Sequence, residues 1–258
     1  LLHEDESNDG VPRFSQPQSI STAPGVLHAG GLPVPAAHDM TGNSLLDLVV
    51  GNSEGELLLF LNRGDPDQPR FGEPVRIRTG GKPFRVDSPG GSIQGPTEIK
   101  FGYTSPVIVD WDGDGIPDIL VSDIRGRHLL LRGKPEGPQE YADPVPLLYQ
   151  GHPLTTVWRV RPAVLRRRPK EPYSYVCLDE EGILSSYLQA SKRDLINKQQ
   201  LRFEDGTPIR FTEDFGGGRG RIKLCATRWC GRERYDLLVG THNRASIPPG
   251  PKGAPRHT

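Results

Sequence analysis

The sequence contains four similar copies of one segment, and this internal repeat restricts the fold more than any other feature. The best-developed copy runs from Pro106 to Gly126. Three further segments align with it without gaps, one shifted 71 residues toward the N-terminus and two shifted 56 and 118 residues toward the C-terminus. Each copy places apolar runs on either side of a turn. We therefore expect one small supersecondary unit to be stacked several times.

The apolar residues fall in short runs rather than at helical spacing. These runs cover residues 45–51, 56–62, 105–111, 118–123, 128–133, 173–179 and 235–240. A run of about five apolar residues between turn residues is typical of a buried strand. Glycine and proline, which disfavour helix interiors, number 31 and 26 among 258 residues. The sequence therefore predicts an all-β fold.

A second marker keeps the same rhythm as the repeat. An aromatic residue is followed three positions later by proline and then by a short aliphatic strand. The marker occurs at Phe14, Phe71 and Tyr141, with a variant at Phe203. Each repeat therefore has room for four short antiparallel strands, which is the makeup of one propeller blade. The alternative is a β-sandwich in which the similarity between copies is coincidental.

The two markers together set the expected bounds of the blades. The predicted blades cover residues 11–63, 64–133, 134–190 and 191–245. The flanking tails, 1–10 and 246–258, have the composition of disordered linkers.

The best-developed copy contains a turn, DWDGDGIPD, that is rich in carboxylates. Calcium takes about six to eight oxygen ligands, so its site needs several carboxylates on a short, sharply bent segment. Gly115 permits the bend, and no basic residue lies within the turn. Closely packed carboxylates also repel one another unless a cation lies between them. The predicted ligands are Asp110, Asp112, Asp114, the carbonyl of Ile116 and Asp118.

The acidic turn also admits other interpretations. Magnesium suits it less well than calcium, because magnesium demands octahedral geometry and retains water. An acidic hairpin turn that binds no ion is the remaining alternative. An EF-hand is excluded, because Val121 stands where that motif needs a glutamate.

The residues around the acidic turn carry a family resemblance. The turn is preceded by Thr-Ser-Pro and followed by Ile-Leu-Val and then by Asp123-x-x-Gly126. This pattern resembles the FG-GAP or VCBS repeat of calcium-binding β-propellers, and the similarity covers roughly residues 11–245. The resemblance implies a Ca²⁺-stabilised β-propeller at the cell surface or outside the cell. Complete propellers of this family have more than four blades, so we expect the remaining blades or domains in a longer chain.

The other copies change the chemistry at the ligand positions. The first copy retains two carboxylates and two neutral oxygens, which predicts a weaker metal site at Asp39, Thr41, Asn43 and Asp47. The third copy offers no anionic ligand, so calcium is not expected there. The residues at its ligand positions are Arg166, Arg168, Lys170 and Ser174. In the fourth copy Asp236 lies near Arg228 and Arg232, and an arginine–carboxylate pair is hypothesised to replace the metal.

A catalytic role would have to come from outside the acidic turn. The motifs of zinc proteases, serine hydrolases and phosphate-binding loops are absent. Some polysaccharide lyases are built on calcium-bearing propellers and abstract a proton beside a uronate carboxylate. The candidates for such a site are Tyr149, His152 and Arg161, with Trp158 and Arg159 as ligand-binding residues. Solvated loop charges, with Trp158 packed between blades, are the favoured interpretation.

The charge balance narrows the class of partner. The chain has 32 basic and 32 acidic residues, which argues against a protein that coats nucleic acid. The arginine-rich segment 165–170 is therefore expected to be a solvated turn rather than an anion or nucleic-acid patch. No apolar run approaches the length of a membrane span. The family resemblance implies a non-catalytic binding module for carbohydrate or protein, with a polysaccharide lyase, or an accessory part of one, as the alternative.

Overall fold

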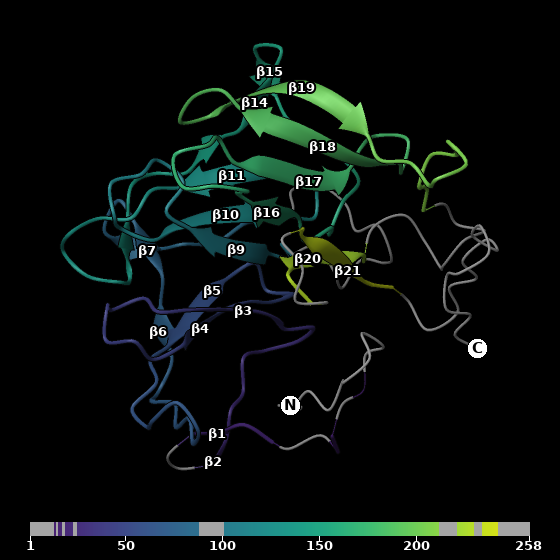
Figure 1. Cartoon of the computed structure of the whole chain (residues 1–258). Coiled ribbons are helices and arrows are strands. Elements are labelled where there is room, and N and C mark those ends of the chain that lie inside the picture. The colour runs from purple at the N-terminus through teal and green to yellow at the C-terminus, as the bar shows by residue number, and fades with distance from the viewer. Residues whose placement is uncertain are drawn as a thin grey trace.

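The computed structural model describes residues 13, 15–16, 19–22, 25–87, 101–211, 221–229 and 234–241. These residues form strands and turns, and this part of the chain contains no helix (Figure 1). The predicted all-β class is confirmed. Consequently, no helix within these ranges is long and apolar enough to cross a membrane. The predicted tails, 1–10 and 246–258, lie outside the described residues.

Three larger antiparallel sheets follow one another along the chain. The first has the order β3-β4-β5-β6, with β3 (Val34–His38), β4 (Asp47–Gly51), β5 (Leu57–Phe60) and β6 (Val75–Arg76). The second has the order β9-β10-β11-β13, with β9 (Ser105–Val109), β10 (Asp118–Ser122), β11 (His128–Leu131) and β13 (Val145–Pro146). The third contains β16 (Ala163–Leu165), β17 (Ser174–Leu178), β18 (Leu184–Gln189) and β19 (Asp194–Gln200).

Smaller strands extend or connect these sheets. The hairpin of β14 (Leu148–Tyr149) and β15 (His152–Pro153) adds to the edge of the third sheet, because β14 pairs in parallel with β19. A fourth sheet consists of β20 (Lys223–Thr227) and β21 (Asp236–Gly240). The remaining short strands are β1 (Ser21–Thr22), β2 (Gly25–Val26), β7 (Arg78–Thr79), β8 (Lys82–Pro83) and β12 (Glu140–Tyr141).

The four sheets meet along their first strands. β3 lies against β9, β9 against β16, and β16 against β20. Figure 1 shows the same succession, with the first sheet at the bottom, the second in the middle, the third at the top and β20 and β21 beside β16. Successive sheets therefore present faces to one another.

Apolar side chains fill the space between neighbouring sheets. Within β10, Ile119 and Val121 pack toward the first sheet, whereas Leu120 packs toward the third. A third cluster joins the third and fourth sheets, with Val176 and Leu224 among its buried members. Strands that are buried on both faces need apolar residues at successive positions, not only at alternate ones. This burial explains the continuous apolar runs of the sequence.

The hydrogen-bonded sheets are offset from the predicted blade bounds. The short strands that follow the markers at Phe71 and Tyr141 are β6 and β13. β6 pairs with β5, and β13 pairs with β11. Each marker therefore leads into the last strand of one sheet instead of the first strand of the next.

The third sheet contains two strands that the apolar runs did not predict. β18 and β19 cover residues 184–200 and carry mostly polar side chains. Most of the β19 side chains are exposed, because this strand lies near the outer edge of its sheet. Their pairing with β17 places them in the sheet without an apolar signal of their own.

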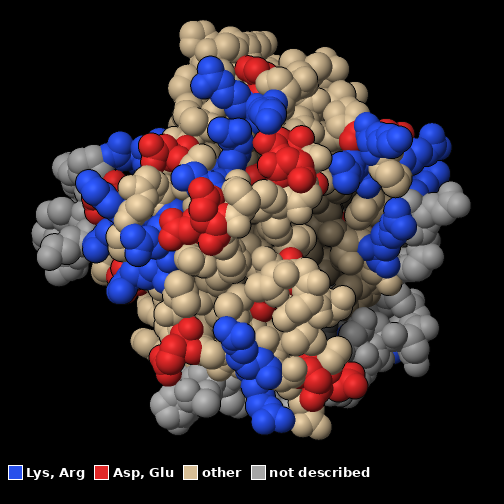
Figure 2. All heavy atoms as spheres, turned by 90° about the vertical axis from the view of Figure 1, so that its left-hand side faces the viewer, with Lys and Arg blue, Asp and Glu red and all other residues tan. Residues whose placement is uncertain are grey.

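The surface carries both signs of charge in small patches. Figure 2 shows one face of the molecule, on which clusters of Lys and Arg lie next to clusters of Asp and Glu. This mixture agrees with equal numbers of acidic and basic residues in the chain.

Candidate metal centre

The acidic turn connects β9 to β10, and its first aspartate organises it. The last residue of β9, Val109, pairs with Asp118, the first residue of β10. The Asp110 carboxylate accepts hydrogen bonds from the backbone N–H groups of Gly113 (2.8 Å) and Gly115 (3.2 Å). Both glycines have positive φ, 80° and 87°, a conformation that glycine adopts without a steric penalty. The turn is thus folded around one carboxylate.

Asp118 ties the two ends of the turn to the next strand. Its Oδ2 accepts hydrogen bonds from the N–H groups of Trp111 (2.9 Å) and Asp112 (3.3 Å), and its Oδ1 accepts one from Gly133 (2.8 Å). The pKa of Asp118 is raised to about 6, chiefly by burial; the nearby charge of Asp112 acts in the same direction, and these hydrogen bonds oppose the rise. A positive charge near Asp118 would therefore favour the ionised form of its carboxylate.

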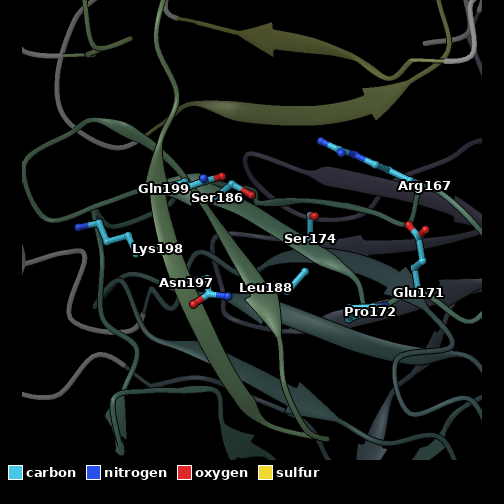
Figure 3. Close-up of a pocket in the computed structure, with 9 residues that line it drawn as sticks. All are labelled: Arg167, Glu171, Pro172, Ser174, Ser186, Leu188, Asn197, Lys198 and Gln199. Atoms are coloured by element: carbon cyan, nitrogen blue, oxygen red, sulfur yellow. The ribbon is translucent and has the colours of Figure 1, made fainter.

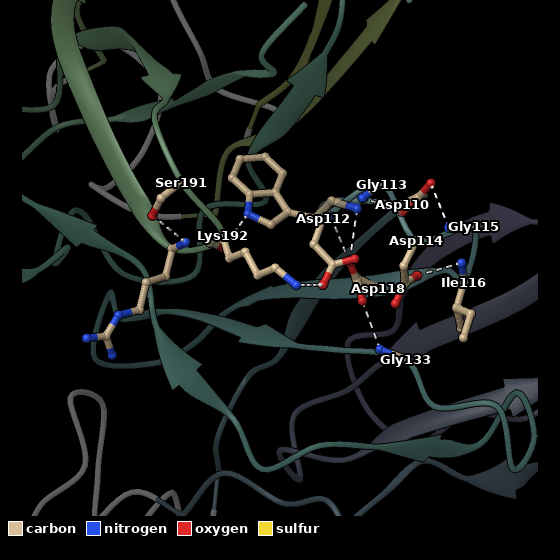
Figure 4. Close-up of polar contacts among 12 residues, drawn as sticks. Asp110, Asp112, Gly113, Asp114, Gly115, Ile116, Asp118, Gly133, Ser191 and Lys192 are labelled. Atoms are coloured by element: carbon tan, nitrogen blue, oxygen red, sulfur yellow. Dashed lines mark hydrogen bonds and ion pairs between the residues drawn. The ribbon is translucent and has the colours of Figure 1, made fainter. Parts of the chain in front are cut away.

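Asp112 is the aspartate whose carboxylate is least satisfied. Its side chain is only 2% exposed, and its Oδ2 pairs with the Lys192 ammonium at 3.0 Å. Its Oδ1 is buried and has no hydrogen-bond partner. Figure 4 shows Lys192 reaching across from a loop of the third sheet to this carboxylate. An orphaned buried carboxylate oxygen is costly, so this atom marks a place for a cation.

Three of the predicted ligands lie together. Carboxylate oxygens of Asp110, Asp112 and Asp118 fall within 4.8 Å of one another. Asp114 is exposed and stands outside this group, and its Oδ1 accepts a hydrogen bond from the Ile116 N–H at 2.9 Å. Hard carboxylate oxygens on a tight turn are the donor set that calcium prefers. The residues present therefore fit a calcium ion.

The first copy has the same skeleton but fewer charges. Asp39 accepts hydrogen bonds from the N–H groups of Thr41, Gly42, Asn43 and Ser44, at 2.7 to 3.2 Å. Although slight burial opposes the effect, these bonds together lower the pKa of Asp39. Asp47 accepts bonds from Met40 (3.0 Å) and Asn62 (2.7 Å), just as Asp118 binds Trp111 and Gly133 at positions 71 residues later.

The turns of these two copies share their hydrogen bonds from backbone N–H groups but differ in the charge of their side chains. Asn43 Oδ1 accepts the Leu45 N–H at 2.9 Å, as Asp114 does with Ile116. Thr41 stands where the second copy has Asp112. In the first copy the turn is thus held by hydrogen bonds from backbone N–H groups to two aspartates, and the charge of Asp112 is the main addition in the second copy. The weaker metal site at Asp39 and Asp47 stays a prediction.

The third and fourth copies replace acid by arginine. Arg166 lies over the Tyr173 ring, with its Cζ 4.4 Å from the ring centroid. Arg228 lies over the Tyr235 ring at 5.2 Å. Arg232, the other partner considered for Asp236, lies outside the described residues. The hypothesis of an arginine–carboxylate tether in the fourth copy therefore stays a prediction.

The residues considered for catalysis do not converge. Tyr149 and His152 pair with each other in the β14–β15 hairpin, where His152 is exposed. Arg161 lies just before β16 and donates to the carbonyl of Pro106 at 3.1 Å. In the sheet order, β17, β18 and β19 lie between the hairpin and β16.

The two ligand-binding candidates are engaged with the protein itself. Trp158 is partly buried against the core between the third and fourth sheets. Arg159 is buried, and its Cζ lies 3.7 Å from the centroid of the Tyr103 ring. These contacts agree with packing between repeats.

Two contributors to the metal centre were missed by sequence reasoning. Lys192 is 80 residues from Asp112 in the chain, and nothing in the sequence marks it as a partner. The second is Trp111, whose ring stacks on Tyr173 of the third sheet at 5.5 Å and whose Nε1 donates to the Lys192 carbonyl at 2.7 Å. The sequence places Trp111 within the acidic turn but does not show that its ring packs against the third sheet.

Comparison with known proteins defines the class of repeat. Residues 39–121 match the family model described as the FG-GAP-like repeat. This match agrees with the repeat family that the acidic turn predicted. No curated protein matches the chain.

Similarity to solved structures extends over more of the chain. One such structure is a Tc holotoxin pore of Photorhabdus luminescens, with 16% sequence identity and a TM-score of 0.46. The alignment covers 85% of this chain and 9% of the other chain, so the present sequence spans a small part of that protein's length.

Proposed function

We propose that this chain is part of a calcium-stabilised β-propeller that serves as a binding module outside the cell. The proposal of a propeller is supported by the FG-GAP-like repeat and by successive antiparallel sheets that meet along their first strands. Four-stranded antiparallel units arranged in this way are the building blocks of propellers. Further blades would come from a longer chain.

The orphaned Oδ1 of Asp112 is the observation that carries the calcium proposal. Asp110, Asp112 and Asp118 together bring three carboxylates, whereas Lys192 supplies one positive charge. Calcium would add the missing charge and hold the turn closed, with Asp110, Asp112 and Asp118 as ligands and Asp114 at the rim. The Lys192 side chain is 65% exposed, so it can turn toward solvent when a cation binds.

A binding role is favoured over catalysis by the positions of the loop residues. Tyr149 and His152 lie at the outer edge of the third sheet, and Arg161 lies at its opposite side. A base and a cation that act on one sugar must be within a few ångströms of the same carbon. The module would hold a carbohydrate or protein ligand without transforming it. An extracellular location supplies enough calcium for a site of modest affinity.

The calcium proposal is tested by thermal unfolding with calcium, with magnesium and with a chelator. Saturating calcium should raise the melting temperature by about 5 °C, because the ion binds the folded state only. The increase should be larger above pH 6 than below it, since burial raises the pKa of Asp118 to about 6 and calcium needs the ionised carboxylate. The variant Asp112→Asn should lose the response.

The matched control is Asp67→Asn, which removes the same charge from an exposed loop of the first sheet. It should retain the calcium response in full. An unchanged melting temperature in the chelator would contradict the calcium proposal. The binding-only role is tested separately with uronate polysaccharides, by following the ultraviolet absorbance of an unsaturated product. If the native chain formed this product and the variant His152→Ala did not, the binding-only role would be overturned.

A further inference from the structure

Two successive repeats carry the same arginine–tyrosine pair in place of the acidic turn. Arg166 and Arg228 both occupy the repeat position of Asp110, at shifts of 56 and 118 residues. Tyr173 and Tyr235 both occupy the position of Pro117 at the same shifts. In each repeat the guanidinium group lies over the tyrosine ring.

The two pairs line one cavity between the third and fourth sheets. This cavity, called here the arginine–tyrosine pocket, has a volume of about 350 Å³. Its lining comes from the β16–β17 turn and from both ends of the β20–β21 turn. The lining residues that matter for recognition are Arg166, Arg167, Arg228, Tyr173 and Tyr235.

Two of the three guanidinium groups of the pocket, those of Arg166 and Arg228, are held over tyrosine rings. The Tyr173 ring stacks with Trp111 at 5.5 Å between centroids, and the guanidinium of Arg166 lies over it at 4.4 Å. The Tyr235 hydroxyl donates to the Arg166 carbonyl at 3.2 Å, which joins the two turns. Within the described parts of the chain, Arg166, Arg167 and Arg228 form no ion pair with a carboxylate. Three guanidinium groups around one cavity are suited to bind an anion.

A larger polar cavity adjoins this pocket at Arg167. It has a volume of about 670 Å³ and lies on the outer part of the third sheet. Figure 3 shows side chains from β17, β18 and β19 along one face of the sheet, with Arg167 and Glu171 at its margin. Four of the lining groups are hydroxyls or carboxamides, which donate and accept hydrogen bonds: Ser174, Ser186, Asn197 and Gln199.

We infer that these two cavities form one binding site for an acidic oligosaccharide. Guanidinium groups bind carboxylates through paired hydrogen bonds, and the serine, asparagine and glutamine side chains suit the hydroxyls of neighbouring sugar units. An acidic peptide fits less well, because its apolar side chains would find few apolar partners. The larger cavity offers mainly Leu188 and Pro172. The arginine-rich segment 165–170, expected to be only a solvated turn, thus supplies Arg166 and Arg167 to this site. The inference rests on the proposed binding function.

The inference is tested by calorimetric titration with oligogalacturonate and with its methyl-esterified form. The native chain should bind the acid, and esterification should weaken binding by about tenfold or more, because the guanidinium groups lose their carboxylate partners. The double variant Arg166→Gln and Arg228→Gln should lose a similar factor for the acid. The variant Asn197→Ala should weaken binding of both forms equally.

The matched control is the double variant Arg63→Gln and Arg70→Gln, which removes two exposed arginines from a loop of the first sheet. Its affinity should equal that of the native chain. Equal losses of affinity in the control and in the double variant of Arg166 and Arg228 would mean that only the net charge of the chain matters. That result would overturn the proposed site. Polyglutamate that binds as tightly, and through the same arginines, would overturn the choice of a saccharide.

Failure of this inference can be told apart from failure of the proposed calcium module. The calcium-induced rise in melting temperature should be retained in the double variant of Arg166 and Arg228. A native chain that responds to calcium but binds none of the probes would reject the site and leave the calcium-stabilised module in place.

Discussion

At the scale of single residues, each larger sheet has one position that requires glycine, because the backbone of another segment passes close to it. Gly55, Gly126 and Gly182 follow an Asn or Asp by three positions and have φ values of 80°, 69° and 75°. A Cβ at Gly126 would lie 2.0 Å from the Thr156 carbonyl oxygen, and the other two would meet the carbonyls of Val86 and Phe211. The linking segment crosses directly over each turn.

This contact predicts a large effect of Gly126→Ala. The positive φ alone costs about 1 to 2 kcal/mol for a residue with a Cβ. The overlap with Thr156 should add about 1 to 3 kcal/mol, because backbone must move. Urea unfolding of the variant measures the total loss in the free energy of unfolding.

Gly151→Ala is the matched control, since Gly151 has a φ of 78° and no atom within 4 Å of the added Cβ. It should show only the conformational cost. Equal losses in the two variants would mean that the approach of Thr156 does not matter.

At the scale of elements, a buried carboxylate fastens the ends of a hairpin to the following strand. Asp47 opens β4 and accepts hydrogen bonds from Met40, in the preceding turn, and from Asn62, beyond the end of β5. Asp118 does the same in the second sheet. The repeated aspartate is thus a structural tether whether or not a metal is bound nearby.

The tether predicts that Asp47→Ala lowers the free energy of unfolding by about 2 to 4 kcal/mol, because two amides lose their buried acceptor. Urea unfolding in a chelator measures this loss without any contribution from calcium. Asp67→Ala, on an exposed loop, should change stability by less than about 0.5 kcal/mol. An Asp47→Ala variant as stable as this control would refute the tether.

Also at the scale of elements, the polar strands show the limit of sequence patterns. The apolar runs predicted β4, β5, β9, β10, β11 and β17, which are largely buried between sheets, and also β21, which is only partly buried. β19 has no such run, because most of its side chains face solvent. Its place follows from pairing with β18, which a pattern of single residues does not encode.

At the scale of the whole molecule, neighbouring sheets are joined by a buried histidine. His128 of β11 contacts the Tyr175 hydroxyl of the third sheet through Nδ1 at 2.5 Å and Thr156 Oγ1 through Nε2 at 2.6 Å. Burial lowers the pKa of His128 from 6.5 to about 3. The imidazole is therefore neutral in the folded protein, and it takes up a proton more readily in the unfolded chain.

This arrangement predicts a loss of stability in acid. The contribution of His128 is fully present above pH 6.5 and falls as the pH drops from 6.5 toward 3, by about 1.4 kcal/mol per pH unit. The variant His128→Gln should therefore show a shallower decline in the free energy of unfolding between these pH values. Urea unfolding at a series of pH values measures the slope.

The control for this prediction is His152→Gln, because His152 is exposed in the β14–β15 hairpin. It should keep the slope of the native chain. If His128→Gln also kept that slope, the buried imidazole would not be the source of the acid sensitivity.

The all-β class, most of the buried strands and the acidic turn follow from the amino-acid sequence, because they depend on residues that are close together in the chain. The sequence placed Asp110, Asp112 and Asp118 in one turn, and the structure brings their oxygens within 4.8 Å. Only the tertiary structure decided which strand closes each sheet, that Lys192 pairs with Asp112, and that two arginine–tyrosine pairs share a pocket. These contacts join residues from separate repeats, and their distances depend on how the sheets pack.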